Sequence, residues 1–299
     1  MISLKQIHYA LAVDRHLHFR KAAEECNISQ SALSTSLLEL EKQLGFQIFE
    51  RDNRKVLVTP LGKQVLERAR AIELQVEDLR RLADAQRDPL STQMSLGVIP
   101  TIGPYLLPRV LPSLQAEYPK LRLEIVEDQS AELVSLLRRG GLDAAIIALP
   151  YPTDGLLTFP FFSEELKWVV HRELLAKEVT TANDQVIADS NLMLLKDGHC
   201  LKDHALSACS LEDRSVHSFS ATSLATLLQL VAGKMGSTLI PDIALPQLVG
   251  DAQQLSVVPL DDPGPHRELA IAIRPNYPGM KNIESLLAVF KRELQGEAA

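Results

Sequence analysis

Two cysteines, Cys200 and Cys209, stand nine residues apart within residues 196–210. Basic side chains surround the first of them, namely Lys196, His199, Lys202 and His204. Positive neighbours favour the thiolate, which is the nucleophilic form of cysteine. An oxidant could therefore convert Cys200 to a sulfenic acid, and this acid could condense with the Cys209 thiol to form a disulfide.

A disulfide between these cysteines would require the backbone to change. If residues 201–209 are helical, they rise by about 13.5 Å, whereas the Cα atoms of a disulfide lie within about 7 Å of each other. Oxidation would then remodel the segment. Two alternatives stay open: a pair of ordinary buried thiols, or a metal site whose spacing matches no standard zinc pattern. The metal ligands would be His199, Cys200, His204 and Cys209.

Composition and charge limit the function classes. The chain has 299 residues, which predicts about two domains. Its three cysteines cannot form a disulfide scaffold, and the third, Cys26, is expected in a core. The net charge is −7, but residues 1–88 hold 14 Lys and Arg against 13 Asp and Glu, or +1, which leaves −8 for the remainder. A polyanion should therefore bind before residue 88.

No signal peptide or membrane-spanning segment is visible, which predicts a cytoplasmic protein with reduced thiols.

The first 88 residues have the pattern of a winged helix-turn-helix domain with a long linker helix. Apolar spacing and capping residues predict helices over 4–14, 18–26 and 30–44, strands over 47–50 and 55–58, and a helix from Thr59 and Pro60 to about Arg87. The third helix would lie in the major groove of DNA. The last helix is about 40 Å long and should pair with another helix along its apolar stripe.

The polar residues that could contact DNA begin the third helix, whereas basic residues of the second helix and of the wing suit phosphates. These candidates are Arg20, Lys21, Ser29, Gln30, Ser31, Ser34, Thr35, Arg51, Arg54 and Lys55. A three-helix bundle with a solvated face is the alternative, because the charge of this segment is close to zero.

After residue 91 strands and helices alternate, which predicts an α/β domain with a parallel sheet. Ligands of such domains bind at strand ends and helix N-termini. Thr101, Ser130 and Ser223 stand at such positions and could bind a small molecule. Simple N-capping would equally explain Ser130 and Ser223.

The N-terminal residues resemble a known family. The run FRKAAEECNISQSALSTSLLELEKQLGFQIFERDNRKVLVTPLG is similar to the LysR-type transcriptional regulators, with AA, SQSALS, LE-x-x-LG and FER-x-x-R in family order. The resemblance implies a transcription activator rather than an enzyme, which binds promoter DNA as a homodimer or homotetramer and acts with RNA polymerase. In one departure, Leu38, Glu39 and Glu41 stand in the second half of the recognition helix, where basic residues are usual.

The same resemblance implies a DNA-binding domain over 1–88 and a two-lobed, periplasmic-binding-protein-like regulatory domain over 89–299. Lobe I would cover about 92–162 and 268–299, and lobe II about 163–267.

Four later segments are similar to the OxyR-type hydrogen-peroxide sensors of this family: GVIPTIGPYLLPRVLP, LLKDGHCLKDHALSAC, ATSLATLLQLVAG and IRPN. The likeness implies that Cys200 is the peroxidatic thiol and Cys209 the resolving one, with no metal or other cofactor. It implies further that peroxide is positioned or activated by Thr101, Ser130, His199 and Arg274.

Ser130 stands where the family can carry Thr. The alternative function is a LysR-type regulator that binds a small metabolite between its lobes through Thr101, Ser130 and Ser223. A thiol peroxidase or metalloenzyme would leave residues 1–88 unexplained.

Overall fold

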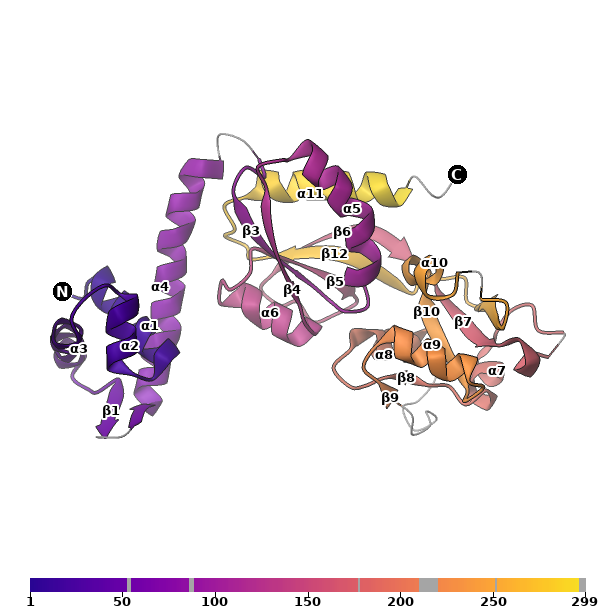
Figure 1. Cartoon of the computed structure of the whole chain (residues 1–299), viewed down its shortest axis with the longest axis horizontal. Coiled ribbons are helices and arrows are strands. Elements are labelled where there is room, and N and C mark those ends of the chain that lie inside the picture. Colours follow the sequence, from indigo (N-terminus) through magenta and orange to yellow (C-terminus); the bar gives the residue numbers. More distant parts are fainter. Residues whose placement is uncertain (53–54, 86–88, 177, 210–219, 251, 296–299) are drawn as a thin grey trace. The chain divides into compact units, whose positions relative to one another are not determined.

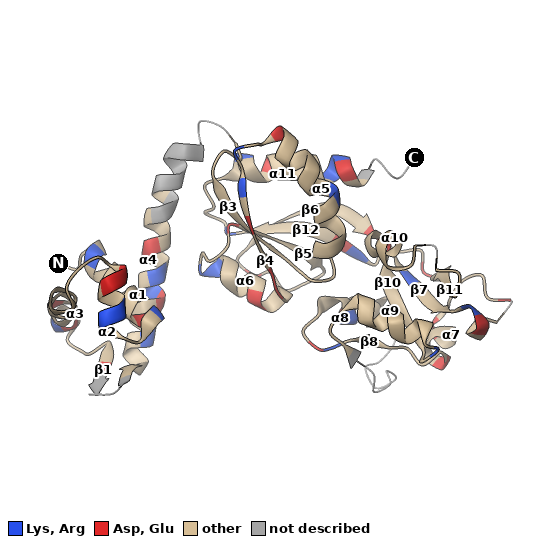
Figure 2. Cartoon of the chain, in the orientation of Figure 1, with Lys and Arg blue, Asp and Glu red and all other residues tan. Residues whose placement is uncertain are grey.

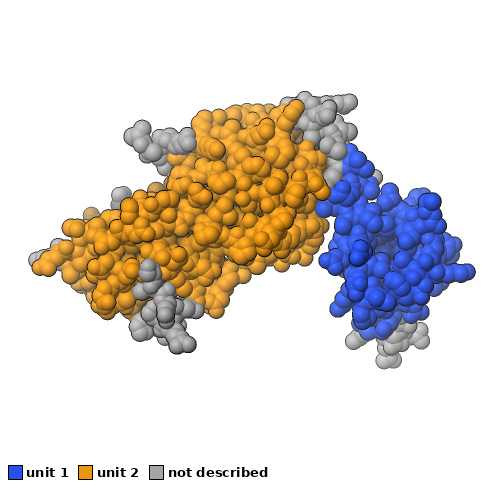
Figure 3. All heavy atoms as spheres, turned by 180° about the vertical axis from the view of Figure 1, so that it is seen from behind, with its two compact units in different colours: residues 1–83 blue, residues 84–299 orange. Residues whose placement is uncertain are grey.

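The computed structural model describes residues 1–52, 55–85, 89–176, 178–209, 220–250 and 252–295. The chain divides into two compact units, residues 1–83 and 84–299 (Figure 3). The predicted domain boundary at residue 88 lies a few residues beyond this division.

The first unit is a helix-turn-helix domain with a two-stranded wing (Figure 1). The wing strands β1 and β2 pair antiparallel, as predicted. The elements are α1 (Leu4–His16), α2 (Phe19–Glu25), α3 (Gln30–Leu44), β1 (Phe49–Asp52), β2 (Lys55–Val58) and α4 (Pro60–Ala85).

The predicted helix caps are confirmed. Ser29 Oγ accepts a hydrogen bond from the backbone N–H of Ala32 at 3.2 Å and so begins α3. Gly45 ends this helix with φ +81°, in the left-handed region that favours glycine. Thr59 Oγ1 accepts from Gly62 N at 2.9 Å, which begins α4. Local hydrogen bonds thus fix the angle at which each helix leaves its loop.

Glu41 joins the wing to α3. Its buried carboxylate accepts hydrogen bonds from Ile48 N at 2.8 Å and from Phe49 N at 3.1 Å. Hydrogen bonds to a charged group contribute about 1.5–3 kcal/mol each to stability. Glu41 therefore does not belong to the exposed surface of α3, and only Leu38 and Glu39 replace basic residues there. The expectation that groups Glu41 with these two is wrong, because the carboxylate is used inside the domain.

Lobe I of the second unit is built on a five-stranded sheet of order β4-β3-β5-β12-β6 (Figure 1). Its elements are β3 (Gln93–Val98), α5 (Gly103–Glu117), β4 (Arg122–Glu127), α6 (Ser130–Arg138), β5 (Ala144–Leu149), β6 (Leu157–Glu164), β12 (Arg267–Ile273) and α11 (Met280–Gln295). Only part of the sheet is parallel: β3 runs parallel to β4 and β5, whereas β12 is antiparallel to β5 and β6.

The predicted parallel pairing holds for β4, β3 and β5 but not for β12, because this strand re-enters lobe I from lobe II. The first residues of β12 pair with the last residues of β5 and β6, so β12 runs in the opposite direction to both.

Lobe II has a three-stranded antiparallel sheet of order β10-β7-β11 and a short parallel pair, β8 with β9. Its strands are β7 (Leu166–His171), β8 (Leu194–Leu195), β9 (Ser220–Ala221), β10 (Ser237–Pro241) and β11 (Leu255–Pro259). Its helices are η1 (Arg172–Leu174), α7 (Asp184–Asp189), α8 (Cys200–Ala208), α9 (Leu224–Ala232), η3 (Asp242–Ala244) and α10 (Leu245–Leu248). None of the described helices is long and apolar enough to cross a membrane.

Candidate redox site

Cys200 and Cys209 occupy the two ends of α8. Cys200 is the first residue of the helix and Cys209 is its C-cap; both are buried free thiols. The nine helical residues rise by about 13.5 Å, and a disulfide needs Cα atoms within about 7 Å. Residues 201–208 are thus helical, as assumed from the sequence. A disulfide between Cys200 and Cys209 therefore requires α8 to unwind.

A tight turn before α8 brings Cys200 against lobe I. Gly198 has φ +94°, and a Cβ atom at this position would lie 2.3 Å from Gln129 Oε1. Gln129 is the N-cap residue of α6. The positive φ favours glycine at this position, and the turn of lobe II lies against Gln129 at the N-terminus of α6, next to Ser130.

Ser130 faces the Cys200 thiol rather than capping its helix. Its side chain is 1% exposed and makes no capping hydrogen bond, so the capping alternative is wrong for this residue. Within the described residues, the buried Ser130 Oγ has no hydrogen-bond partner. The hydroxyl is close enough to Cys200 to lower the pKa of that thiol. Ser223, in contrast, is an exposed cap: its Oγ accepts from Thr226 N at 3.2 Å.

Arg267 supplies the positive charge of the site, a role that the sequence analysis missed. Its side chain is buried with Glu164, and Nε donates to Glu164 Oε1 at 2.6 Å. Its Nη1 and Nη2 donate to Thr101 Oγ1 and to the Thr101 carbonyl, both at 3.3 Å. The charge of Arg267 lowers the pKa of Cys200.

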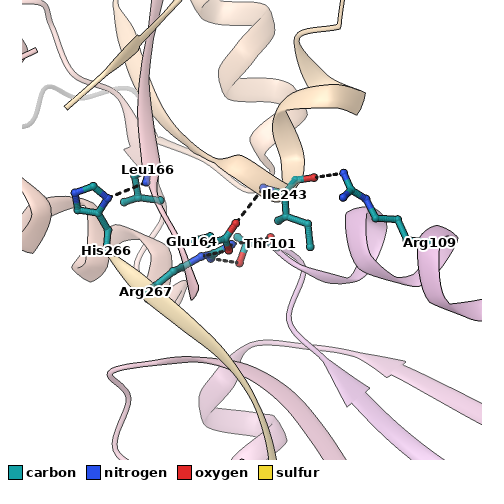
Figure 4. Close-up of polar contacts among 7 residues, drawn as sticks. All are labelled: Thr101, Arg109, Glu164, Leu166, Ile243, His266 and Arg267. Carbon is teal, nitrogen blue, oxygen red and sulfur yellow. Dashed lines mark hydrogen bonds and ion pairs between the residues drawn. The ribbon is translucent and has the colours of Figure 1, made fainter. Parts of the chain in front are cut away.

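Figure 4 shows that these groups lie where the chain passes between the lobes. Glu164 ends β6 and also accepts from Ile243 N at 3.0 Å. The Ile243 carbonyl accepts from Arg109 at 3.4 Å, and His266 Nδ1 accepts from Leu166 N at 2.9 Å. The ion pair is therefore anchored to backbone groups of both lobes.

Arg274 lies away from this cluster. In the register of β12 on β5, Glu268 pairs with Leu149 and Ala272 with Ala145. Arg274 follows the strand and donates to the Leu142 carbonyl at 2.6 Å, with its guanidinium over the Tyr277 ring. It is thus at the opposite end of β5 from the redox site, about 20 Å along the strands. The structure brings together Thr101, Ser130, His199 and Cys200, but not Arg274.

Burial sets the protonation of the site. It raises the pKa of the Cys200 thiol, and the Asp203 carboxylate raises it further, against the effects of Ser130 and Arg267. Burial lowers the pKa of both His199 and His204, so these imidazoles are neutral near pH 7. The prediction that they act as cations is wrong for this reason.

Lys202 is paired with Asp197 at 2.7 Å, and Lys196 is exposed. In the described residues no three His, Cys, Asp or Glu side chains are arranged to hold a metal ion, so the four-ligand alternative is not formed.

Cys209 is less reactive than Cys200 in this conformation. Burial raises the pKa of its thiol to about 12, with a further contribution from Asp184. Since the thiolate is the nucleophile, Cys209 is inert as long as α8 is folded.

The candidate DNA-contacting residues come from α2, from the start of α3 and from the wing. Ser29, Gln30, Ser31 and Thr35 are exposed and Ser34 is half-buried along the start of α3. Arg20 and Lys21 are exposed on α2, where Arg20 pairs with Glu24 at 3.1 Å. Figure 2 shows that acidic and basic residues alternate along the helices of this unit. Arg51 and Lys55 lie in the wing strands without a described side-chain position, and Arg54 lies outside the described residues.

Comparisons with known proteins agree with this architecture. The model "Bacterial regulatory helix-turn-helix protein, lysR family" matches residues 4–63, and the model "LysR substrate binding domain" matches residues 87–295. The hydrogen peroxide-inducible genes activator of Pectobacterium carotovorum subsp. carotovorum is 34% identical, over 99% of this chain and 98% of its own length.

The HTH-type transcriptional regulator EstR of Acinetobacter baylyi is 37% identical, over 97% of this chain and 96% of its own. Among solved structures, the chain is similar to a full-length OxyR from Pseudomonas aeruginosa that carries one substituted cysteine. The TM-score is 0.80 and the sequence identity 32%. The superposition covers 97% of this chain and 95% of the OxyR chain.

Proposed function

The chain belongs to the LysR family of transcription regulators, and we propose that hydrogen peroxide controls it by oxidising Cys200, with Cys209 as the resolving thiol. The observation that carries the proposal is the surroundings of Cys200. A buried thiol, which burial alone would make unreactive, lies beside a hydroxyl and a buried guanidinium that both lower its pKa. The similarity to a peroxide-inducible activator over nearly the whole chain supports the choice of oxidant.

Several residues of the site take part in the first step, the oxidation of Cys200 by peroxide. The Thr101 and Ser130 hydroxyls and His199 hold the peroxide, and Arg267 stabilises the thiolate as the proton leaves Cys200. The sulfur attacks one peroxide oxygen and the O–O bond breaks. The leaving hydroxide takes a proton and becomes water, and Cys200 becomes a sulfenic acid that has lost two electrons.

The second step needs the helix to open. Once α8 unwinds, Cys209 reaches solvent and its raised pKa returns toward the ordinary value for a thiol. Its sulfur then attacks the sulfenic sulfur, water leaves, and the disulfide forms. The bridged segment cannot refold as α8, so the oxidised lobe has a different conformation.

The first unit carries the DNA-binding half of the proposal. The exposed polar residues at the start of α3 would contact base edges, and Arg20, Lys21 and the wing residues would contact phosphates. Leu61, Ile72 and Leu79 are exposed along the outer side of α4, which supports pairing with α4 of a second copy. The proposed form is a cytoplasmic homodimer or homotetramer that acts on promoter DNA with RNA polymerase.

A peptide map tests the sensing step. After stoichiometric peroxide and digestion without reductant, we expect a peptide that links Cys200 to Cys209, and a changed DNA footprint. Cys200→Ser should show neither. A footprint that still responds to peroxide in Cys200→Ser would contradict the role of Cys200. The second candidate, a regulator of another small molecule, would be supported if a metabolite changed the footprint and this response survived in Cys200→Ser. The 37% identity to EstR is the reason to keep that candidate.

Salt dependence of binding tests the phosphate contacts. Lys21→Gln is expected to reduce the slope of log K against log salt by about one per protomer, because one fewer phosphate is neutralised. The measurement uses a random-sequence DNA duplex between about 50 and 200 mM salt, since this effect is independent of sequence. Lys281→Gln removes one exposed charge from the other unit and should leave the slope unchanged. Equal slopes for both variants would contradict the assignment of Lys21.

A further inference from the structure

His204 is a buried histidine one helical turn after Cys200. Both residues lie on α8, and both belong to its buried face, with His204 4% exposed. Residues four apart on a helix are neighbours, with Cβ atoms about 5–6 Å apart. His204 is therefore next to the reactive thiol, although the proposed chemistry so far gives it no task.

The hydrogen bonds of His204 fix its tautomer. Its Nε2 lies 2.9 Å from the carbonyl oxygen of Pro150. A carbonyl can only accept, so Nε2 carries the proton. Because burial lowers the pKa of this imidazole, it is neutral and its Nδ1 holds a free lone pair. This Nδ1 atom is buried and, in the part of the chain that the structure describes, has no hydrogen-bond partner.

The same charged groups act on His204 and on Cys200. Arg267, from β12, and Asp203, from α8, both influence the pKa of each residue. Tyr151, which follows the Pro150 anchor, has its pKa raised by burial and by Cys200. Among the described residues, Arg267 and Asp203 are the charged groups that shift the pKa of His204, and Cys200 and Tyr151 are further titratable groups of the same region. These shared neighbours agree with the four-residue spacing on α8, which brings the imidazole and the thiol close together.

We propose that His204 is the proton acceptor for the oxidation of Cys200, an inference that rests on the proposed peroxide chemistry. The Cys200 proton passes to His204 Nδ1 through the peroxide held between them, as the sulfur attacks the near oxygen. The O–O bond breaks, and the protonated Nδ1 returns the proton to the leaving hydroxide. The products are the Cys200 sulfenic acid, water and a neutral His204, so atoms and charges balance. The Pro150 carbonyl holds the other proton on Nε2 throughout, so that Nδ1 is the nitrogen that gains and loses the transferred proton.

The test is the pH dependence of the first oxidation step, measured by quenched flow and mass spectrometry of the full chain. A Cys209→Ser background isolates this step. His204→Gln is the informative variant, because its side-chain amide can still donate to Pro150 but cannot accept a proton in this pH range. His204→Phe removes both functions, and Ser207→Gln changes an exposed position of the same helix as a control.

With His204 present, the rate should be nearly constant from about pH 7 to 8 and should fall only when the pH drops below the ordinary imidazole pKa of about 6.5, because burial lowers the pKa of His204. In His204→Gln the rate should follow the small thiolate fraction and rise about tenfold per pH unit. At about pH 6 the variant should be about a hundredfold slower than its parent, within the usual contribution of a general base. Ser207→Gln should behave like the parent.

Three outcomes separate the hypotheses. If His204→Gln retains the rate and the pH profile of its parent, the inference is wrong while the proposed function stands. If His199→Gln loses the flat region and His204→Gln keeps it, His199 is the acceptor and the inference is again overturned. If the parent itself forms no sulfenic acid at Cys200, the proposed function fails, and the inference with it.

Discussion

Replacing Arg267 by methionine is expected to slow the reaction of Cys200 with peroxide by about a hundredfold, the size of effect seen when one preorganised electrostatic donor is removed. The guanidinium is the cation that lowers the pKa of Cys200, while burial raises it. Without this charge the pKa of the Cys200 thiol rises further, and a smaller fraction of the thiol is ionised at pH 7. The rate of alkylation by iodoacetamide, measured against pH, reports this change directly.

The same substitution should also destabilise the second unit. Arg267 and Glu164 are both fully buried, and removal of one partner leaves a buried carboxylate without its counter-charge. The expected loss is about 3–5 kcal/mol of unfolding free energy, measured by chemical denaturation of the full chain.

A double variant separates reactivity from stability. In Arg267→Met with Glu164→Gln, the buried charge is gone from both partners, so most of the stability should return. The slow reaction of Cys200 should remain, because the cation is still absent. If the double variant is stable and reacts as fast as the native chain, Arg267 acts only in folding and its assigned role is wrong.

Replacing Cys209 by serine is expected to stop the reaction at the first stage and to abolish the conformational response. Cys200 would gain one oxygen atom by mass, but no disulfide could form and α8 would remain folded. Amide hydrogen exchange in residues 200–208 should therefore stay slow after peroxide in Cys209→Ser, and become fast in the native chain. The DNA footprint should change only in the native chain.

Cys26→Ser is the matched control for this experiment. Cys26 is a half-buried thiol of the first unit, and burial raises its pKa. Its replacement should leave both the hydrogen exchange of α8 and the footprint response intact. The disulfide is not the switch if Cys209→Ser and the native chain give the same footprint after oxidation.

Local signals in the sequence predicted much of the first unit and of the redox segment. Ser29, Gly45 and Thr59 act through hydrogen bonds within a few residues, so their positions mark the helix ends wherever the rest of the chain lies. In the second unit, where the sequence predicts only an alternation of strands and helices, some elements carry weak local signals. β11 carries the half-exposed Val257, and α7 is six residues long.

The site itself depended on contacts between distant residues. Arg267 and Arg274 flank the same strand, and the sequence does not say which end of β12 faces Cys200. The chain direction decides it, because β12 starts where it enters lobe I. A signal was present in the run RELAIAI, where a charged residue begins a strand whose other residues are mostly buried.

Whether a histidine is charged also depends on contacts with residues that are distant in the sequence. The sequence places His199 and His204 beside Cys200, and this spacing alone predicts that they supply positive charge. Burial in the folded lobe lowers the pKa of both, which removes this charge near pH 7. Ser130 illustrates the same point, because the neighbouring thiol, and not its own helix, uses its hydroxyl.

The burial of Cys209 at the far end of α8 also determines how the chain would register the strength of a stimulus. A sulfenic acid at Cys200 has two fates in a reducing cell: small thiols can reverse it, or α8 can open and Cys209 can capture it. The outcome depends on the ratio of these two rates. A brief oxidation is erased before the helix opens, whereas sustained oxidation accumulates in the bridged form. The free energy of opening α8 would therefore determine how much peroxide is needed for a response. Substitutions on the exposed side of this helix, such as Ser207→Gly, would change the required peroxide dose without changing the redox chemistry.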